Sequence, residues 1–401
     1  MMSRSDITPH SACRVCGTPA VPPFLDFGLQ PLANALRTKA QLNEPEFLAP
    51  LAVWNCATCG LSQLTHTVSP TRLYTDYLFR SETSPSWRQH CQKLAREAIK
   101  RSTTQNTVVL DIASNDGTLL KEFARYGCTV IGVDPAENVR ADIPTLTGFW
   151  DDAMTERVRH KHGGVDIVTA TNVLGHVDDV LGFLLNIRTV LRREGLAIIE
   201  VPSVMSLVQN NEFPTIYHEH LSYWSAHALI QAATRAGLYV ARVELQAIHC
   251  GSLRMYLKKQ STLWGTATDR VLQEEARWLT EKPYQRFRKT VTQTLRSLSS
   301  VLTETKILWG YGASAKGTML LNLLSPETPL PIAVIDDAPA KQGLYLPGVH
   351  LPVVGPTDLS TVDTLMLLSW NNADDLKVRA EQLGFAGTFL IPIPEPQLEK
   401  E

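Results

Sequence analysis

The sequence predicts an α/β protein with two doubly wound parallel sheets and a small metal-binding lobe in front of them. Runs of β-branched residues alternate with helical stretches between residues 107 and 201, and the alternation starts again at residue 306. Such alternation is typical of βαβ units, whose parallel strands are covered by helices on both faces. A pair of CxxC motifs within the first 60 residues predicts the lobe.

Length and composition limit the kind of protein. A chain of 401 residues accommodates two or three domains, and 44% hydrophobic with 19% charged residues is ordinary for globular domains. A net charge of −2 gives no general affinity for nucleic acid or for an anionic membrane. The sequence shows neither a charged-then-apolar leader nor an apolar run of about 18 residues. We therefore expect a cytoplasmic monomer that binds neither nucleic acid nor membranes.

The first region, expected to span residues 1–72, carries two cysteine knuckles with a glycine after each second cysteine. The four candidate metal ligands are Cys13, Cys16, Cys56 and Cys59. In a large cytoplasmic chain this pattern indicates metal binding before disulfides, and four thiolates close a tetrahedral zinc shell of the structural kind. Four unrelated buried thiols are the alternative. A nucleic-acid-binding ribbon is disfavoured because the surrounding residues are apolar and only weakly basic.

The predicted strand at 107–111 leads through a turn of small residues into a helix. Small residues let backbone amides approach a ligand closely, and Asp134, at the end of the next strand, is placed to accept hydrogen bonds from ribose hydroxyls. The turn departs from GxGxxG and resembles the first motif of class I S-adenosylmethionine-dependent methyltransferases, with Ala113 where glycine is usual. An ordinary βα turn is the alternative. The expected cofactor contacts are Asp111, Ala113, Ser114, Asn115, Gly117, Asp134 and Asn172.

Two further polar segments are candidates for chemistry. Asn172 and His176 follow the strand at 165–170, where ligands of open α/β sheets bind, although a lone histidine there can also be a packing residue. The cluster at 215–225 is rich in titratable and hydroxyl side chains, among them Tyr217, Glu219 and His220. An imidazole oriented by a carboxylate suits removal of a proton from carbon next to a carbonyl, and a tyrosine can stabilise the resulting enolate. A polar loop that caps a helix is the alternative, whereas the HExxH spacing of zinc enzymes is absent.

The last region reads as a second, smaller doubly wound unit behind a charged helical connector at 267–306. Gly310, Gly312 and Gly317 suggest a nucleotide turn, but the third glycine stands two places beyond its position in GxGxxG, which weakens an NAD interpretation. We expect three domains, with boundaries at 1–72, 73–240 and 241–401.

Taken together, the motifs occur in one characteristic order. They are the segments 13–16 with 56–59, 25–34, 114–117, 172–176, 217–220, 310–317 and 341–348. In this order the chain resembles the three-domain sugar C-methyltransferases of antibiotic deoxysugar pathways over nearly its whole length. The resemblance implies a zinc lobe, a class I methyltransferase core of Rossmann-like fold that binds S-adenosylmethionine, and a C-terminal Rossmann-like domain that assists sugar-nucleotide binding.

The resemblance also implies roles for residues. His220 is the base that removes the C3 proton of a nucleotide-linked, dTDP-type 4-keto deoxysugar, with Glu219 and Tyr217 positioning it and His176 beside the reacting oxygens. The implied substrate contacts are Tyr77, Ser252, Arg254 and Lys316. Phe79 replaces a second family tyrosine and Cys250 a common glycine, so the details of the substrate stay open. O- or N-methylation, a non-sugar acceptor and a non-catalytic sugar-nucleotide-binding module are the alternatives.

Overall fold

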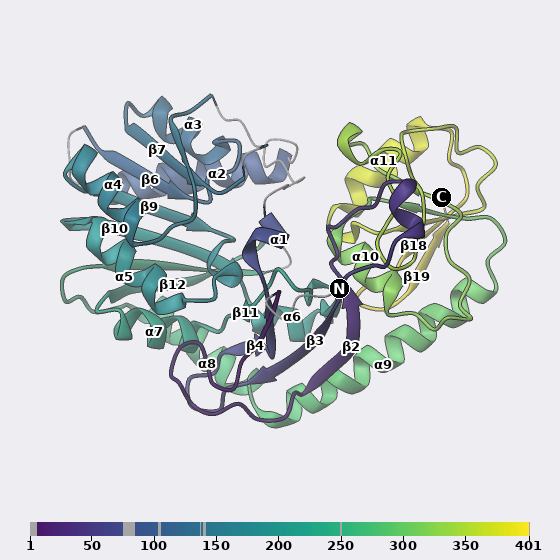
Figure 1. Ribbon diagram of the computed structural model, residues 1–401, viewed down its shortest axis with the longest axis horizontal. Helices are drawn as coiled ribbons and strands as arrows, with labels where there is room; N and C mark the ends of the chain where they lie inside the picture. The colour runs from purple at the N-terminus through teal and green to yellow at the C-terminus, as the bar shows by residue number, and fades with distance from the viewer. Residues whose placement is uncertain are drawn as a thin grey trace.

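The computed structural model describes residues 6–74, 85–102, 106–136, 138, 142–248 and 251–400. Within these residues the strands form four sheets. Figure 1 shows two α/β lobes, one blue to teal and one green to yellow, with the purple N-terminal strands between them. The predicted α/β class, with parallel-stranded sheets and a four-cysteine lobe, is confirmed.

The N-terminal lobe is built on an antiparallel sheet in the order β11-β4-β3-β2. Its strands are β2 (Leu25–Pro31), β3 (Leu48–Asn55), β4 (Ser62–Leu64) and, from far along the chain, β11 (Ser222–Tyr223), while β1 (Ile7–Pro9) pairs with β5 (His66–Val68). Each cysteine knuckle turns at its glycine, because Gly17 and Gly60 have φ of 72° and 75°, a region that other residues rarely adopt. Their N–H groups donate to the carbonyls of Cys13 and Cys56.

The central lobe has a seven-stranded sheet in the order β12-β13-β10-β9-β6-β7-β8. The strands are β6 (Val108–Ile112), β7 (Thr129–Asp134), β8 (Thr145–Thr147), β9 (Val165–Thr171), β10 (Leu191–Pro202), β12 (Tyr239–Gln246) and β13 (Ser252–Lys258). Helices α2 and α3 pack their apolar residues on one face of this sheet, and α4, α5 and α7 on the other. These helices are α2 (Pro85–Arg101), α3 (Thr118–Arg125), α4 (Asp152–His162), α5 (Val180–Val190) and α7 (Ala226–Arg235).

The edge of this sheet differs from the expected division of the chain. The boundary expected at residue 240 falls inside β12, and the next strand, β13, pairs antiparallel with both β10 and β12. The sheet therefore continues to Lys258, because β10 would otherwise be an unpaired edge.

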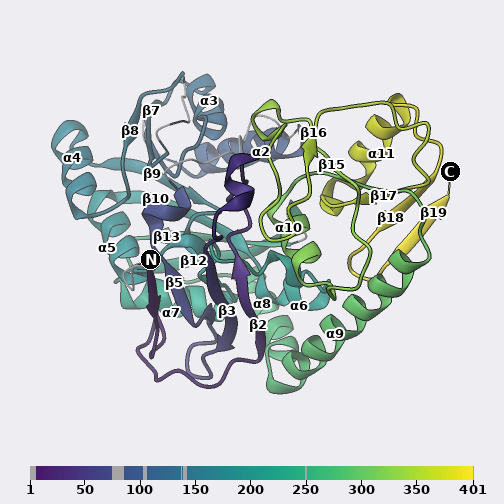
Figure 2. The ribbon, with the colours of Figure 1, turned by 45° about the vertical axis from the view of Figure 1, so that its right-hand side comes forward.

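The C-terminal lobe has a six-stranded sheet in the order β16-β15-β14-β17-β18-β19, parallel except for β19. Its strands are β14 (Leu308–Tyr311), β15 (Val334–Ile335), β16 (Val353–Val354), β17 (Thr364–Leu367), β18 (Thr388–Ile391) and β19 (Gln397–Lys400). Helices α10 (Ala315–Asn322) and α11 (Ala373–Gln382) belong to this lobe. The charged connector forms α8 (Thr266–Trp278) and α9 (Glu281–Thr303), and Figure 2 shows α9 running along the base of the molecule.

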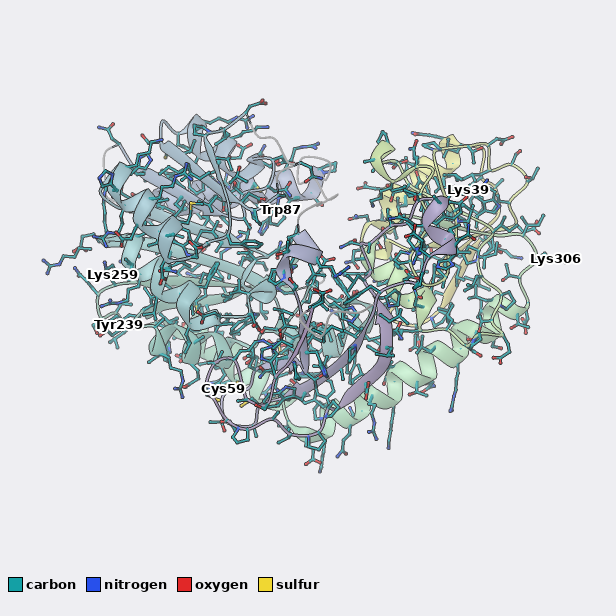
Figure 3. All side chains as sticks on the ribbon, viewed as in Figure 1. Lys39, Cys59, Trp87, Tyr239, Lys259 and Lys306 are labelled. Carbon is teal, nitrogen blue, oxygen red and sulfur yellow. The ribbon has the colours of Figure 1, made fainter. Side chains whose placement is uncertain are left out.

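The N-terminal segment crosses to the C-terminal lobe. Arg37 and Tyr345 exchange backbone hydrogen bonds of 2.9 and 2.8 Å, and Glu46 accepts the N–H of Gly348 and contacts His350 at 3.0 Å. Figure 3 accordingly places Lys39 against the C-terminal lobe, far from Cys59. The remaining helices are η1 (Ala40–Asn43), α1 (Pro70–Tyr74), η3 (Leu174–His176), α6 (Val204–Gln209), η4 (Phe213–Thr215), η6 (Pro339–Lys341) and η7 (Trp370–Asn372). In the part of the chain that the structure describes, no helix combines the length and apolarity needed to span a membrane.

Candidate active site

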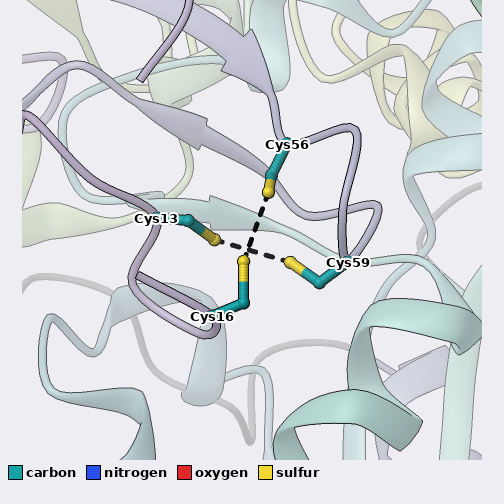
Figure 4. A group of neighbouring side chains, drawn as sticks. All are labelled: Cys13, Cys16, Cys56 and Cys59. Carbon is teal, nitrogen blue, oxygen red and sulfur yellow. Dashed lines mark hydrogen bonds between the residues drawn. The ribbon is translucent and has the colours of Figure 1, made fainter. Parts of the chain in front are cut away.

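The four predicted metal ligands come together in the N-terminal lobe (Figure 4). All four sulfur atoms lie within 4.8 Å of one another, with Cys13–Cys59 at 3.5 Å and Cys16–Cys56 at 3.4 Å. Zinc–sulfur bonds of about 2.3 Å place tetrahedral thiolates about 3.8 Å apart. The four sulfur atoms therefore fit a closed zinc shell, which leaves no coordination position for a substrate.

The turn after β6 has the backbone shape of a ligand cradle. Ala113, Asn115 and Gly117 have φ of 59°, 49° and 74°, so the chain passes repeatedly through the left-handed region. At the end of β7, Asp134 accepts the N–H of Asn115 at 2.8 Å. The Ser114 hydroxyl is buried and has no hydrogen-bond partner among the described residues. A buried orphan hydroxyl is typical of a site that a polar ligand completes.

Two further predicted cofactor residues lie on the neighbouring strand ends. Asp111 is 3% exposed and accepts the Thr169 hydroxyl at 2.6 Å, and burial raises its pKa to about 7. Asn172, just after β9, has φ of 55°, and its Oδ1 is buried without a partner among the described residues. The orphaned oxygens of Ser114 and Asn172 thus follow the paired strands β6 and β9. Together with the cradle they fit S-adenosylmethionine, whose ribose and amino-acid ends both offer hydrogen-bonding groups.

His220 lies after η4 with a defined ring orientation. Its Nδ1 is 2.8 Å from the carbonyl oxygen of Thr215, which can only accept a hydrogen bond. In the neutral ring Nδ1 therefore carries the proton and Nε2 the lone pair. The imidazole packs between Tyr217, with ring centroids 4.1 Å apart, and His176, with centroids 4.9 Å apart. Three of the four predicted catalytic side chains thus form one cluster.

Tyr74, which sequence reasoning missed, joins this cluster from α1. Its hydroxyl donates to the carbonyl of Glu219 at 3.1 Å and lies 3.1 Å from Nδ1 of His176. Burial lowers the pKa of His176 to about 4, so this imidazole is neutral at pH 7. The predicted Tyr77 lies outside the described residues. Tyr74 stands three residues before Tyr77, and this proximity was the only signal for it. The local sequence does not tell which of the two tyrosines faces the site.

The expectation that Glu219 orients His220 is corrected, because the Glu219 carboxylate has a different partner. Glu219 is 3% exposed, and its Oε1 accepts the side-chain amide of Asn34 at 2.6 Å, whereas Oε2 has no partner among the described residues. Burial raises the pKa of Glu219 to about 7, although the Asn34 hydrogen bond opposes the shift. The orienting group of His220 is the Thr215 carbonyl, because the tight turn after η4 brings the backbone to the ring. Asn34 was missed as well, since it lies 185 residues away in the chain.

The predicted substrate contacts at Ser252 and Arg254 lie inside the central lobe. Ser252 is fully buried and its hydroxyl donates to the carbonyl of Ile248. Arg254 is 1% exposed and donates to Glu200 at 2.7 Å and to Glu97 at 2.9 Å. Burial alone would raise the pKa of Glu200, but a hydrogen bond with His90 and the charge of Arg254 hold it below its usual value. A substrate contact by Arg254 would require these ion pairs to open.

Lys316, the remaining predicted substrate contact, connects the C-terminal and central lobes. Its ammonium lies 3.1 Å from a carboxylate oxygen of Glu212, whose other oxygen accepts the indole N–H of Trp370 at 3.1 Å. Glu212 is 5% exposed and precedes the segment that carries His220. The structure therefore places Lys316 in an interlobe ion pair.

The glycine turn of the C-terminal lobe is arranged like the cradle of the central lobe. At the end of β15, Asp336 accepts the N–H of Ala313 at 2.8 Å, as Asp134 accepts that of Asn115. Here, however, Lys341 lies 3.0 Å from Asp336 and donates to the carbonyl of Ala313. The acidic group that would bind a ribose is thus paired within the chain, which further weakens the NAD interpretation of this turn.

Known proteins match this chain along its length. Family profiles for a zinc binding domain, a methyltransferase domain and a C-methyltransferase C-terminal domain match residues 13–74, 80–243 and 247–394. The C-methyltransferase NovU of Streptomyces niveus is 30% identical over 409 aligned residues, which cover 98% of this chain and 97% of that protein. The chain belongs to the three-domain C-methyltransferase family. This C-methyltransferase accordingly depends on S-adenosylmethionine, and its N-terminal lobe is a zinc-binding domain.

Two more distant matches each cover less than half of this C-methyltransferase. A ubiquinone biosynthesis O-methyltransferase of Rhodopseudomonas palustris is 31% identical over 115 residues, 27% of this chain and 45% of that protein. The crystal structure of magnesium protoporphyrin IX methyltransferase from Synechocystis, with S-adenosylhomocysteine bound, aligns with 43% of this chain at 14% identity and a TM-score of 0.35.

Proposed function

We propose that this C-methyltransferase adds a methyl group to C3 of a nucleotide-activated 4-keto deoxysugar, with dTDP as the nucleotide, and that His220 is the general base. The observation that carries the proposal is the hydrogen bond from Nδ1 of His220 to the Thr215 carbonyl. It selects the neutral tautomer whose Nε2 lone pair can take a proton from carbon.

The proposed step is a deprotonation followed by carbon alkylation. Nε2 of His220 takes the C3 proton, the C–H electron pair forms a double bond between C3 and C4, and the carbonyl electrons move to the C4 oxygen. S-adenosylmethionine, when bound, would supply an electrophilic methyl group on sulfur. C3 would take up this methyl with the electrons of the C3–C4 double bond, so that the C4 carbonyl forms again and S-adenosylhomocysteine leaves with the electrons of the broken sulfur–carbon bond. Neutral His176 is proposed to lie beside the reacting oxygens of the sugar, since its pKa of about 4 keeps it uncharged at pH 7.

The other side chains of the cluster are proposed to hold the acceptor. Tyr217 packs on the His220 ring and is placed to contact the sugar, and Tyr74 keeps His176 and the Glu219 backbone together. Glu219 offers a carboxyl that Asn34 holds on one oxygen only. A nucleotide-linked sugar is proposed as the acceptor because the motifs resemble those of the sugar C-methyltransferases. We also propose a division into three domains at 1–72, 73–240 and 241–401, although the sheet of the central lobe extends to Lys258.

The test identifies the product. The enzyme is incubated with S-adenosylmethionine carrying a carbon-13 methyl group and with dTDP-linked 4-keto deoxysugars that bear hydroxyl or amino groups at C3. We expect a product one methyl heavier whose carbon-13 shift and coupling show a carbon-linked methyl at C3. An oxygen- or nitrogen-linked methyl, or no product from any of these sugars while S-adenosylmethionine still binds, would overturn the proposed acceptor.

A further inference from the structure

We propose that the zinc lobe is a positioning element for the two active-site histidines, and that Arg14 is the residue through which it acts on His176. The inference rests on the proposed roles of His176 and His220. It assigns to the lobe a function in turnover, through contacts that reach both polar segments of the site.

Arg14 lies between the first two cysteines, and all three nitrogens of its guanidinium donate hydrogen bonds. Its side chain is 2% exposed, and its Nε donates to Asp178 at 2.9 Å. The two terminal nitrogens donate to the carbonyl of Leu64 at 2.9 Å and to the hydroxyl of Thr67 at 2.8 Å. A planar guanidinium with four directed hydrogen bonds, the fourth to Gln63, fixes its partners in a way that a lysine cannot.

Asp178 connects Arg14 to the active site, because it follows His176 by two residues. Its Oδ1 accepts from Arg14, from the Thr67 hydroxyl at 3.0 Å, and lies 3.2 Å from His10. All three partners belong to the N-terminal lobe. The short turn η3 that presents His176 is therefore held from outside the central sheet.

The second knuckle holds the segment that carries His220. Directly after this knuckle, β4 pairs antiparallel with β11, and the N–H of Leu64 donates to the carbonyl of Leu221 at 2.9 Å. The Ser225 hydroxyl donates to the carbonyl of Gly60, the glycine of the knuckle, at 3.3 Å. The residue next to His220 is thus bonded to the zinc lobe.

The contacts that hold the His176 turn and those that hold the His220 segment both involve Gln63 in β4. Its side-chain oxygen accepts the backbone N–H of Arg14 at 3.1 Å and a guanidinium N–H at 3.3 Å, while its backbone pairs opposite Ser222. A Cβ at Gly175 would lie only 3.2 Å from the Ser222 carbonyl, so the His176 turn already packs against β11. The metal, by fixing Cys13 and Cys16 around Arg14, would set the edge-to-face contact of His176 and His220, whose ring centroids are 4.9 Å apart.

The test compares Arg14→Gln with a matched control, Arg192→Gln. Arg192 pairs with Asp166 at 2.7 Å at the start of β9, the opposite end of the strand that leads to His176. Zinc content, S-adenosylmethionine affinity, kcat and hydrogen–deuterium exchange of peptides covering 173–179 are measured on the full chain. For Arg14→Gln we expect unchanged zinc and cofactor binding, a kcat about 10- to 100-fold lower, and faster exchange in 173–179. The control should show neither the lower kcat nor the faster exchange in 173–179.

Asp178→Ala and the double variant complete the test. Asp178 lies outside the knuckle, so Asp178→Ala leaves the zinc ligands and their turn intact if Arg14→Gln fails to fold. It should reproduce the slower turnover and faster exchange, and the double variant should add little to either single change. Unchanged exchange and kcat within about twofold in Asp178→Ala would overturn the inference. Because exchange needs no acceptor, failure of the sugar assignment would leave this readout intact.

Discussion

At the scale of single residues, the two imidazoles of the site are held by different partners. His220 donates from Nδ1 to a backbone carbonyl, while Nδ1 of His176 faces the Tyr74 hydroxyl. A carbonyl fixes tautomer and orientation but offers no counter-charge, so it does not hold the protonated ring as a carboxylate would. A base oriented in this way can release its proton again after each turnover.

The buried carboxyl of Glu219 predicts a pH dependence of stability with a definite sign. Burial raises its pKa to about 7, above its value in the unfolded chain. Such a group favours the folded state fully below its unfolded pKa, and this contribution is lost as pH rises through about 7. Glu219→Gln keeps a neutral group and the Asn34 contact at every pH. Relative to the unchanged protein, the variant should therefore gain up to about 3 kcal/mol in unfolding free energy between pH 5 and pH 8.5.

Urea unfolding of both proteins at the two pH values checks this prediction. Asn34→Ala in the Glu219→Gln background is the companion variant, because it removes the partner without restoring a charge. A difference between the two proteins that stays constant from pH 5 to pH 8.5 would contradict the raised pKa of Glu219.

At the scale of elements, the turn between β6 and α3 contains measurable strain at Ala113. Its φ of 59° lies in the left-handed region, which an alanine adopts at a cost that glycine avoids. Ala113→Gly should keep S-adenosylmethionine affinity and change stability by less than about 1 kcal/mol, because relief of strain offsets the added freedom of the unfolded chain. Ala113→Val should lower the free energy of unfolding by about 1–3 kcal/mol and weaken the binding of S-adenosylmethionine.

Calorimetric titration of S-adenosylmethionine and thermal unfolding measure both effects. Equal affinity and stability in the glycine and valine variants would show that the turn does not form the proposed cradle.

The strands were largely predictable because burial on both faces of a parallel sheet leaves runs of apolar and β-branched residues. The strands around Val109, Ile131, Ile167 and Ile198 are continuous apolar runs, and the structure has a buried parallel strand at each. The pairing of β12 and β13 with the central sheet was not predicted, since a sequence pattern does not tell which sheet a strand extends. The two knuckles were predictable for the same local reason, because spacing and glycine encode the turn.

The site was predictable only where one segment supplies both partners. Tyr217 and His220 are close in sequence, and their rings pack against each other in the structure. Asn34 and Tyr74 approach from the N-terminal lobe, so no local pattern could indicate them. Arg254 has charged partners on strands and helices far apart in the chain, and only the fold shows that its charge is already balanced.

At the scale of the whole molecule, the zinc lobe shares its core with the central lobe. One apolar cluster contains Cys13, Val15 and Cys59 together with Leu174 and Trp224 of the central lobe. Loss of the metal should therefore destabilise both parts in one transition. We expect Cys59→Ser to lower the metal content and to shift a single calorimetric unfolding peak of the zinc and central lobes downward, since structural zinc contributes folding free energy.

Differential scanning calorimetry with parallel metal analysis checks this coupling. Two separated transitions in Cys59→Ser, with the S-adenosylmethionine-dependent one at its original temperature, would show that the lobe unfolds on its own. Less than about one zinc per chain in the unchanged protein would contradict the four-thiolate site.

The central claim is that His220 removes a proton from carbon next to a ketone, and exchange at that carbon tests it most directly. The enzyme is held with S-adenosylhomocysteine and a dTDP-4-keto deoxysugar in deuterated water, and the C3 proton is followed by NMR. We predict rapid enzyme-dependent loss of the C3 signal, slowed about 10²- to 10⁴-fold in His220→Asn. His218→Asn is the control, because His218 is buried with its Nε2 on the carbonyl of Ala49 and should retain exchange. Exchange in His220→Asn as fast as in the unchanged enzyme would contradict the account.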